Sequence, residues 1–221
     1  MPSKSRNSFP SDYTDEELRA EARKLERAVT IPVNVEIEAD HKVLDLGEVE
    51  KILSQAKRII LQDCGCRRDK KNCDAPLDIC VTVDQSDDYV TKNAKYHPHE
   101  CTLEEALNAL KRSHEAGLVH MAYVMKGNSR PTVVCSCCVC CCHTLGGLLR
   151  RGIATQVLTS NFVAEWDSEK CVKCGRCAER CVFGARTLDN DELKCDQSRC
   201  FGCGLCISTC PADAITLVPR R

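Results

Sequence analysis

The chain has 221 residues, among them 20 cysteines, 31 lysines and arginines and 32 aspartates and glutamates, which give a formal net charge of −1. This balanced charge excludes the strongly basic surface typical of nucleic-acid-binding proteins, so we expect no nucleic acid partner. The hydrophobic content of 43% includes the cysteines, and only 4% of the residues are aromatic, so we expect a thin apolar core that the cysteines supplement as metal ligands or as disulfides.

The context of the cysteines favours metal binding over disulfides. Disulfide-dense domains are mostly small secreted proteins, and residues 1–30 contain no apolar segment of the kind that a secretory signal requires. No stretch approaches the roughly 18 apolar residues that indicate a membrane span. We therefore predict a cytoplasmic protein without a membrane span, in which the thiols stay reduced and bind metal.

The first elements of the chain are predicted to be a helix and a strand. Thr14 and Glu17 form a capping box, which predicts a helix over residues 15–28. Residues 31–37 alternate between apolar and polar side chains and predict a strand. Such mixing of helix and strand continues through the N-terminal part of the chain and predicts an α+β fold class, with a small α/β-like module in this part.

A second helix is predicted over residues 45–57, followed by an apolar strand at residues 59–61. This strand leads into the first cysteine-rich segment, in which four thiols occur within 17 residues. Four thiolates are enough to hold one cluster or one zinc ion, so we predict a third metal site here. Its candidate ligands are Cys64, Cys66, Cys73 and Cys80.

Positive charges lie inside this segment, at Arg67 and Arg68 among others. Cations beside a thiolate-bound cluster offset its negative charge and raise its reduction potential, although a run of charges also occurs on ordinary solvated loops. His97 and His99, close to Cys101, are candidate metal ligands, but a loop constrained by the intervening proline is the favoured interpretation.

A second capping box, Thr102 with Glu105, predicts a helix over residues 102–116, and Gly117 is its expected end. A strand is predicted over residues 118–125. After it comes the second cysteine-rich segment, with six cysteines in eight positions: Cys135, Cys137, Cys138, Cys140, Cys141 and Cys142.

These six thiols are too many for the ordinary role of cysteine as a small core residue. In a strand Cys135 and Cys137 would share a face, whereas in a helix Cys138 would share one with Cys141 and Cys142. Not all six can point at one cluster. We therefore predict that they include ligands of the third site, ligands of a further [4Fe–4S] cluster or zinc site, or redox-active thiols.

His143, directly after this run, is the best candidate for a functional histidine. The segment that follows contains two adjacent glycines, but neither a dinucleotide-binding motif nor a phosphate-binding loop. A flavin or nicotinamide site is therefore not predicted.

The last quarter of the chain contains an internal duplication. A shift of 29 residues superimposes residues 167–171 on residues 196–200, together with the cysteines and glycines that follow. Repetition at one fixed offset indicates a duplicated supersecondary unit. We therefore predict a domain boundary that separates residues 1–163 from residues 164–221.

Each copy of the duplicated unit contains the pattern C-x2-C-x2-C-x3-C, which is the pattern of bacterial ferredoxins that bind [4Fe–4S] clusters. The region thus resembles the two-cluster bacterial ferredoxins, in which the fourth cysteine of each motif ligates the other cluster. The resemblance implies a compact unit of short hairpin strands and two short helices. It assigns one cluster to Cys171, Cys174, Cys177 and Cys210, and the second to Cys200, Cys203, Cys206 and Cys181.

One position departs from the ferredoxin pattern, because Val182 stands where the family usually has the proline that Pro211 supplies in the second motif. We expect this change to alter local geometry or potential, not to remove the cluster. The competing interpretation is a pair of zinc sites, but zinc knuckles do not repeat four cysteines at these spacings.

A second resemblance covers most of residues 60–215 and is to a family of cysteine-rich dicluster ferredoxin-domain proteins of anaerobes. The matching positions are Cys64, Cys66, Arg67, Cys73, Pro76, Cys80, the six cysteines of residues 135–142, and residues 160–165. This resemblance supports the organisation of the chain and names no substrate.

The sequence therefore predicts an electron-transfer protein that works with a redox partner protein. One alternative makes the N-terminal cysteine-rich site catalytic, so that the chain would be an oxidoreductase or a subunit of one. Another alternative is a ferredoxin fused to a structural zinc-binding interaction module.

Overall fold

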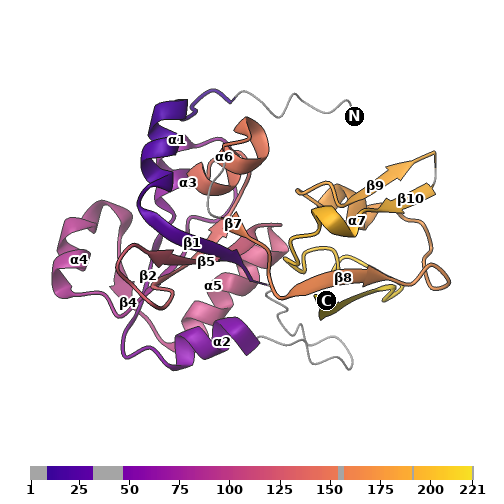
Figure 1. Cartoon of the computed structure of the whole chain (residues 1–221). Helices are drawn as coiled ribbons and strands as arrows, with labels where there is room; N and C mark the ends of the chain where they lie inside the picture. Colours follow the sequence, from indigo (N-terminus) through magenta and orange to yellow (C-terminus); the bar gives the residue numbers. More distant parts are fainter. Residues whose placement is uncertain (1–8, 32–46, 154–156, 191, 221) are drawn as a thin grey trace.

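The computed structural model describes residues 9–31, 47–153, 157–190 and 192–220 of the chain. These residues form a mixed α+β structure with cysteine-rich loops, which confirms the predicted fold class (Figure 1). No helix in the described ranges is long and apolar enough to cross a membrane.

A seven-stranded sheet dominates the N-terminal part, with the strand order β4-β2-β3-β6-β5-β1-β7. All of its neighbouring strands pair antiparallel except β1 and β7, which are parallel. The strands are β1 (Leu25–Thr30), β2 (Ile59–Asp63), β3 (Asp78–Val83), β4 (His99–Glu100), β5 (Val119–Met125), β6 (Val133–Cys137) and β7 (Val157–Leu158).

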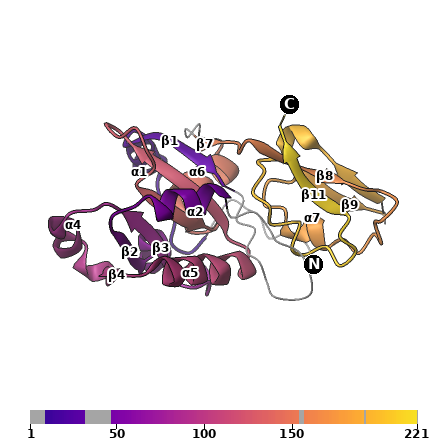
Figure 2. The same ribbon diagram turned by 90° about the horizontal axis from the view of Figure 1, so that it is seen from below.

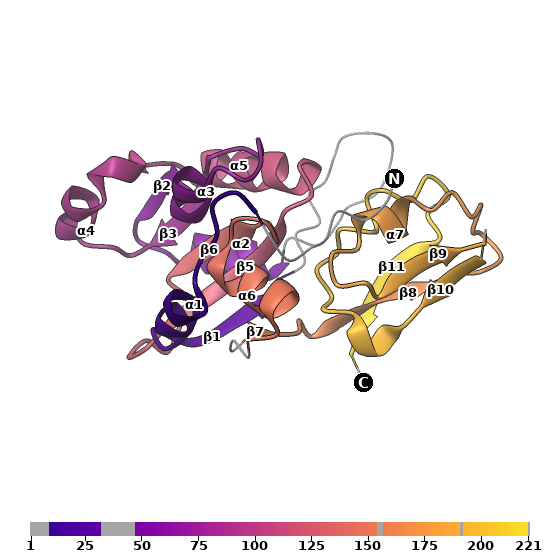
Figure 3. The same cartoon turned by 90° about the horizontal axis from the view of Figure 1, so that it is seen from above.

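Helices lie on both faces of this sheet. The helices α2 and α5 cover one face, which Figure 2 shows from below, and α1 and α6 lie over the other, which Figure 3 shows from above. The helices of this part are α1 (Asp15–Ala22), α2 (Gly47–Ser54), α3 (Gly65–Lys70), α4 (Asp87–Lys92), α5 (Leu103–Glu115) and α6 (His143–Arg151), with a 3₁₀ turn η1 (Ala94–Tyr96).

The two faces of the sheet have separate cores. The core beneath α2 and α5 includes Leu53, Val81 and Leu110. The core on the opposite face includes Tyr123 of β5 and Leu145 of α6. Because strand side chains alternate between faces, Cys135 and Cys137 of β6 share the second face with Tyr123, as the extended interpretation of that segment predicted.

The C-terminal region contains two small antiparallel sheets, one of β8 with β11 and one of β9 with β10. Each copy of the duplicated unit has one strand before its cysteine motif and one after it, which accounts for the repeat in the sequence. The elements are β8 (Phe162–Trp166), α7 (Arg176–Arg180), β9 (Arg186–Asp189), β10 (Glu192–Cys195), the 3₁₀ turn η2 (Gln197–Arg199) and β11 (Ile215–Pro219).

The two regions of the chain are in direct contact. Phe183 and Leu205 belong to the same buried cluster as Tyr123 of the N-terminal sheet. The guanidinium of Arg180 donates to the carbonyl of His114 in the last turn of α5, where a cation compensates the negative end of the helix. The Nε2 atom of His114 also lies 2.7 Å from the hydroxyl of Ser208.

Both predicted capping boxes are present, at Thr14 and at Thr102. The strand at residues 59–61, the helix ending before Gly117 and the strand at residues 118–125 are confirmed as β2, α5 and β5. The second predicted helix is present as α2, although residue 45, its predicted start, lies outside the described residues.

The first predicted helix was too long. It ends at Ala22 and not near residue 28, because residues 25–30 form β1 and pair with β5. Pairing with a strand about a hundred residues away overrides the local helical pattern. Of the strand predicted at residues 31–37, only Ile31 is described, and it directly follows β1.

The resemblance to ferredoxins implied two short helices in the C-terminal region, but its described residues contain one α-helix, α7. Residues 205–209 of the second motif form turns instead. The first motif has Ala178 and Glu179 at the corresponding positions, which are good helix formers. In the second motif the hydroxyl of Thr209 donates to the carbonyl of Cys206 at 3.0 Å, and such side-chain bonds compete with helix formation.

Candidate metal centres

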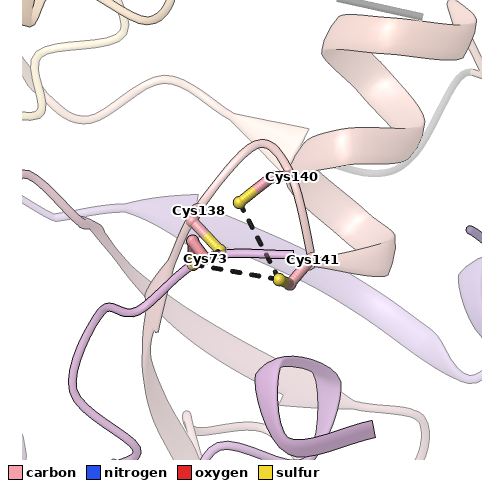
Figure 4. Close-up of side chains that lie close together, drawn as sticks. All are labelled: Cys73, Cys138, Cys140 and Cys141. Carbon is pink, nitrogen blue, oxygen red and sulfur yellow. Dashed lines mark hydrogen bonds between the residues drawn. The ribbon is translucent and has the colours of Figure 1, made fainter. Parts of the chain in front are cut away.

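Four thiols from two separate segments meet beyond the end of β6, the central strand of the N-terminal sheet. The Sγ atoms of Cys73, Cys138, Cys140 and Cys141 all lie within 4.8 Å of one another. Figure 4 shows Cys138, Cys140 and Cys141 on the loop between β6 and α6, with their sulfurs directed towards Cys73, which belongs to the segment after α3. We call these residues the four-cysteine group.

The spacing of these sulfurs fits a single tetrahedral ion. The Sγ of Cys73 lies 3.8 Å from that of Cys138 and 3.9 Å from that of Cys141, and Cys140 lies 3.8 Å from Cys141. Four sulfurs at the Zn–S bond length of about 2.3 Å form a tetrahedron whose edges are about 3.8 Å long. The group therefore has the donor set and the dimensions of a tetrathiolate zinc site.

The loop that carries three of these thiols is held by α6. The Nε atom of Arg150 donates to the carbonyl of Val139 at 2.9 Å. A β-carbon at Gly146 would lie 2.7 Å from the same carbonyl oxygen, so the close approach of helix and loop requires glycine at this position.

The N-terminal segment and the loop that carries Cys73 also help to hold the four-cysteine group in place. The carboxylate of Asp12 accepts bonds of 2.5 and 2.7 Å from Arg150, whose side chain has 0% exposed surface. The bond from Arg150 is the largest cause that holds the pKa of Asp12 well below its usual range. Asn72 donates to the carbonyls of Ser11 at 2.6 Å and of Cys140 at 3.1 Å, which ties the two cysteine segments together.

Arg67 is buried beside the group, with 1% of its surface exposed. It donates to the carbonyls of Pro76 and Ser136, and its Nη2 lies 3.7 Å from the Sγ of Cys138. Its Nε has no hydrogen-bond partner among the described residues. Burial lowers the pKa of Arg67, but nearby thiols, first that of Cys64 and then that of Cys138, raise it more. A buried cation needs an anion nearby, and thiolates supply it here.

Interactions within the four-cysteine group favour ionisation of one of its thiols, that of Cys138. Hydrogen bonds from Cys140, and then from Cys141 and Cys73, hold the pKa of Cys138 well below its usual range. The same bonds from Cys138 raise the pKa of Cys140 and of Cys141. Metal binding removes the remaining protons, because thiolates and not thiols are the ligands of metal ions.

The first cysteine-rich segment does not converge on one point, although its four cysteines were predicted together as candidate ligands. Cys73 joins the four-cysteine group, whereas the Sγ of Cys80 lies 3.8 Å from that of Cys135 on the neighbouring strand. Cys64 and Cys66 line a separate cavity of about 160 Å³.

This cavity lies between α3, β6 and the start of α6. Its wall includes Cys135, Cys137 and Cys142 from the second cysteine-rich segment. His143 also lines it, with Nδ1 lying 3.1 Å from the Sγ of Cys66, and burial lowers the pKa of this histidine. Of the six cysteines of the second segment, three belong to the four-cysteine group and five line this cavity, because Cys138 and Cys141 do both.

The other candidate histidines are not part of either arrangement. The Nδ1 of His97 lies 3.0 Å from Asp63, and the Nδ1 of His99 lies 3.2 Å from the carbonyl of His97. Both side chains are exposed. His97 directly follows η1, in agreement with the favoured interpretation as a constrained loop, whereas His99 begins the short strand β4.

In the C-terminal region one small cavity is lined by Cys171, Cys174, Cys177 and Cys210. Burial raises the pKa of Cys206 to about 12, with Cys200 and Cys181 among the neighbours that also raise it. Cys210, which ends the second motif, thus lines the same cavity as the first three cysteines of the first motif, and Cys181 is a neighbour of Cys203 and Cys206.

Backbone amides point at several of these sulfurs. The Sγ atoms of Cys171, Cys200 and Cys210 accept bonds from the N–H groups of Lys173, Ala164 and Ala214 at 3.4, 3.5 and 3.2 Å. Hydrogen bonds to cluster sulfurs are one of the means by which proteins set reduction potential. The donor set and these amides fit [4Fe–4S] clusters.

One buried charge of the C-terminal region was not predicted from sequence. Arg186 is 4% exposed and lies between the two groups of cysteines, close to Cys177 and Cys206. Its Nη1 also donates to the Sγ of Cys195 at 3.1 Å. Nothing in the sequence distinguishes Arg186 from the other arginines as the one that is buried.

Comparison with known proteins agrees with this arrangement. Residues 170–214 match the family model of the 4Fe–4S dicluster domain. The match supports a ferredoxin-like domain that binds 4Fe–4S clusters, and it indicates an iron–sulfur electron-transfer role with a redox partner. A search among curated proteins finds no match to the chain.

Proposed function

We propose that this protein is a cytoplasmic electron carrier with two [4Fe–4S] clusters in residues 164–221 and one zinc ion in residues 1–163. The match of residues 170–214 to the dicluster domain, which contains all eight motif cysteines, is the observation that carries the first part. The sulfur spacing of the four-cysteine group carries the second.

In the proposed assignment, the two clusters exchange the final cysteines of their motifs. Supporting this, Cys210 lines the cavity of the first motif, and Cys181 is among the neighbours that influence the thiols of Cys203 and Cys206. A [4Fe–4S] cluster supplies one-electron chemistry when it is bound.

The chain's own residues set the conditions for that chemistry. Backbone amides donate to the sulfurs of three ligands, and the buried guanidinium of Arg186 offsets negative charge between the two groups of cysteines. Both features favour the more negatively charged, reduced form and so raise the reduction potential.

The first motif is the more accessible of the two to a redox partner. Val172 has 63% of its surface exposed, and Cys174 is exposed beside it. In the second motif, by contrast, Leu205 is 1% exposed and packs against the N-terminal sheet. We propose that a partner protein docks at the loop of residues 171–175.

The direct test uses the full chain purified without oxygen. We expect Cys174→Ser to change or remove one of the two electron paramagnetic resonance signals that the C-terminal clusters give in the reduced protein, and to lower the iron content. The matched control is Cys101→Ser, a half-buried cysteine of the N-terminal region outside both predicted ligand sets, which should leave both signals in place. Two unchanged signals in Cys174→Ser would contradict the ligand assignment.

A further inference from the structure

The cavity of about 160 Å³ between α3, β6 and α6 is not explained by the electron carrier or by the zinc ion. Seven thiols line it. Two of them, Cys138 and Cys141, belong to the four-cysteine group, and Cys135 is paired with Cys80 at 3.8 Å. Four thiols remain, and they are those of Cys64, Cys66, Cys137 and Cys142.

These four thiols surround the cavity and do not join the compact four-cysteine group. They come from two segments of the chain: Cys64 and Cys66 lie at the start of α3, Cys137 ends β6, and Cys142 directly precedes α6. An arrangement around a cavity suits a polynuclear cluster, whose iron atoms each take one thiolate from a different side. One ion would instead require four sulfurs about 3.8 Å apart.

The surroundings of the four sulfurs resemble those of the C-terminal ligands. The backbone N–H of Leu145 donates to the Sγ of Cys142 at 3.4 Å, as backbone amides do at Cys171, Cys200 and Cys210. The hydroxyl of Tyr123 lies 3.4 Å from the Sγ of Cys137. Hydrogen bonds to ligand sulfurs are typical of iron–sulfur sites.

The charge of the cavity wall also fits an anionic cluster. Arg67 lines the cavity with 1% exposed surface and no hydrogen-bond partner for its Nε among the described residues. The side chain of Arg67 contacts two carbonyls and one thiol, and none of these contacts is a carboxylate that would balance its charge. A buried guanidinium of this kind requires a nearby anion, which a cluster with four thiolates provides.

The cavity is close to the proposed electron carrier. Cys137 and Cys142 belong to the same packed cluster as Phe183, and Cys181 and Cys203 pack against that cluster. The aromatic rings of Phe183 and Phe201 stack there, with centroids 4.3 Å apart. A redox centre in the cavity would therefore share one packed layer with the ligands of the second C-terminal cluster.

We propose that this cavity binds a third [4Fe–4S] cluster, ligated by Cys64, Cys66, Cys137 and Cys142. As a redox centre, this site rests on the proposed function, because the two C-terminal clusters are its nearest source of electrons. The evidence that the cavity binds a cluster does not depend on that function, because it comes from the cavity itself, its four thiols and the buried guanidinium of Arg67.

The test counts iron, zinc and acid-labile sulfide per full chain after anaerobic purification, in the unaltered protein and in Cys64→Ser, Cys66→Ser and Cys142→Ser. We expect about twelve irons, twelve sulfides and one zinc in the unaltered protein. Each variant should lose about four irons and four sulfides and keep its zinc and both C-terminal resonance signals. Retention of the zinc and of both C-terminal signals shows that the variant is folded.

The matched control is Cys101→Ser, a half-buried cysteine of the same region that does not line the cavity and should keep all twelve irons. About eight irons in the unaltered protein, or full iron in all three variants, would overturn the proposal. Failure of the proposed function gives a different result, namely about four irons that depend on Cys64 and Cys142 while Cys174→Ser changes nothing.

Discussion

In the C-terminal region each motif places three cysteines within seven residues, whereas the four-cysteine group joins Cys73 to a loop that begins 65 residues later. The first arrangement needs only a tight loop and one exchanged cysteine. The second needs β6, α6 and the segment after α3 to be correctly packed. The comparison shows that regular spacing indicates a site directly, while an irregular cluster of cysteines indicates only that some site exists.

The two regions share one structural feature. Each buries an arginine among thiols, Arg67 in the N-terminal part and Arg186 in the C-terminal part. Thiolates gathered in a small volume repel one another, and a fixed cation reduces that cost. The difference lies in the ligand spacing, which fits one ion at the four-cysteine group and clusters at the ferredoxin motifs.

The largest effect is expected where the four-cysteine group holds the N-terminal region together. Structural zinc contributes on the order of 10 kcal/mol to the folding of small zinc domains. We expect Cys138→Ser to lose its zinc and to unfold at a markedly lower temperature, while the C-terminal resonance signals remain. Calorimetry with zinc analysis checks this, and the control Cys101→Ser should keep its zinc. A full zinc content in Cys138→Ser would contradict the assignment of zinc to the four-cysteine group.

Replacement of the buried arginines tests their shared role. Removal of one partner from a buried charge pair costs about 3–5 kcal/mol, so Arg67→Met and Arg186→Met should each destabilise the metal-loaded protein by that order. Chemical denaturation under anaerobic conditions measures the change. The control is Arg112→Met, whose exposed ion pair with Asp78 is expected to contribute no more than about 1 kcal/mol. Equal effects at all three positions would contradict the role of the buried charge.

A smaller effect is expected at the loop of the second ferredoxin motif. Gly202 has a φ of +68°, and a β-carbon there would collide with the hydroxyl of Ser160 and the carbonyl of Phe162. Gly202→Ala should cost about 1–3 kcal/mol through strain and forced contacts. Gly152 has a similar φ of +61° with nothing within 4 Å of the added carbon, so Gly152→Ala isolates the conformational strain. If thermal unfolding shows the same loss in both variants, the close packing at Gly202 has no energetic role.

The smallest effect concerns the contact between the two regions. Burial lowers the pKa of His114 to about 4 and that of His120 to about 3, with Arg180 and the neighbouring histidine adding to the shifts. Both histidines are therefore neutral in the folded protein. The unfolded chain takes up their protons as the pH falls below about 6.5, so the free energy of unfolding falls by on the order of 1 kcal/mol per pH unit for each histidine.

Denaturation between pH 7 and pH 5 measures this dependence. His114→Gln removes one titrating group and retains a donor for Ser208, so its stability should fall less steeply as the pH is lowered. Parallel profiles for the variant and the unaltered protein would show that His114 does not couple the contact to pH.

Local signals in the sequence predicted local structure well. The capping boxes at Thr14 and Thr102 needed only residues three positions apart, and both are present. The ferredoxin motifs are equally local, so their spacing identified the eight cysteines, while the resemblance to two-cluster ferredoxins supplied the predicted grouping into two ligand sets. The first helix was predicted too long, because β1 owes its conformation to β5, far along the chain.

The grouping of the N-terminal cysteines depends on contacts that no local pattern encodes. Cys73 and Cys80 are seven residues apart, yet one joins the four-cysteine group and the other lies against Cys135. His114 and His120 flank a helix end in the sequence, and their buried rings stack on each other, with His114 beside Ser208 of the C-terminal region. Burial of Arg67 likewise follows from the packing of β6 against α3, which the charge run in the sequence does not reveal.

X-ray absorption at the zinc edge, on the anaerobically purified full chain, tests most directly the claim that the four-cysteine group and the ferredoxin motifs bind different kinds of centre. We predict one zinc per chain, surrounded by four sulfurs at about 2.3 Å and without a neighbouring metal. The signal should be lost in Cys138→Ser and kept in Cys174→Ser. A chain without zinc, or with zinc bound through nitrogen and oxygen, would contradict the account.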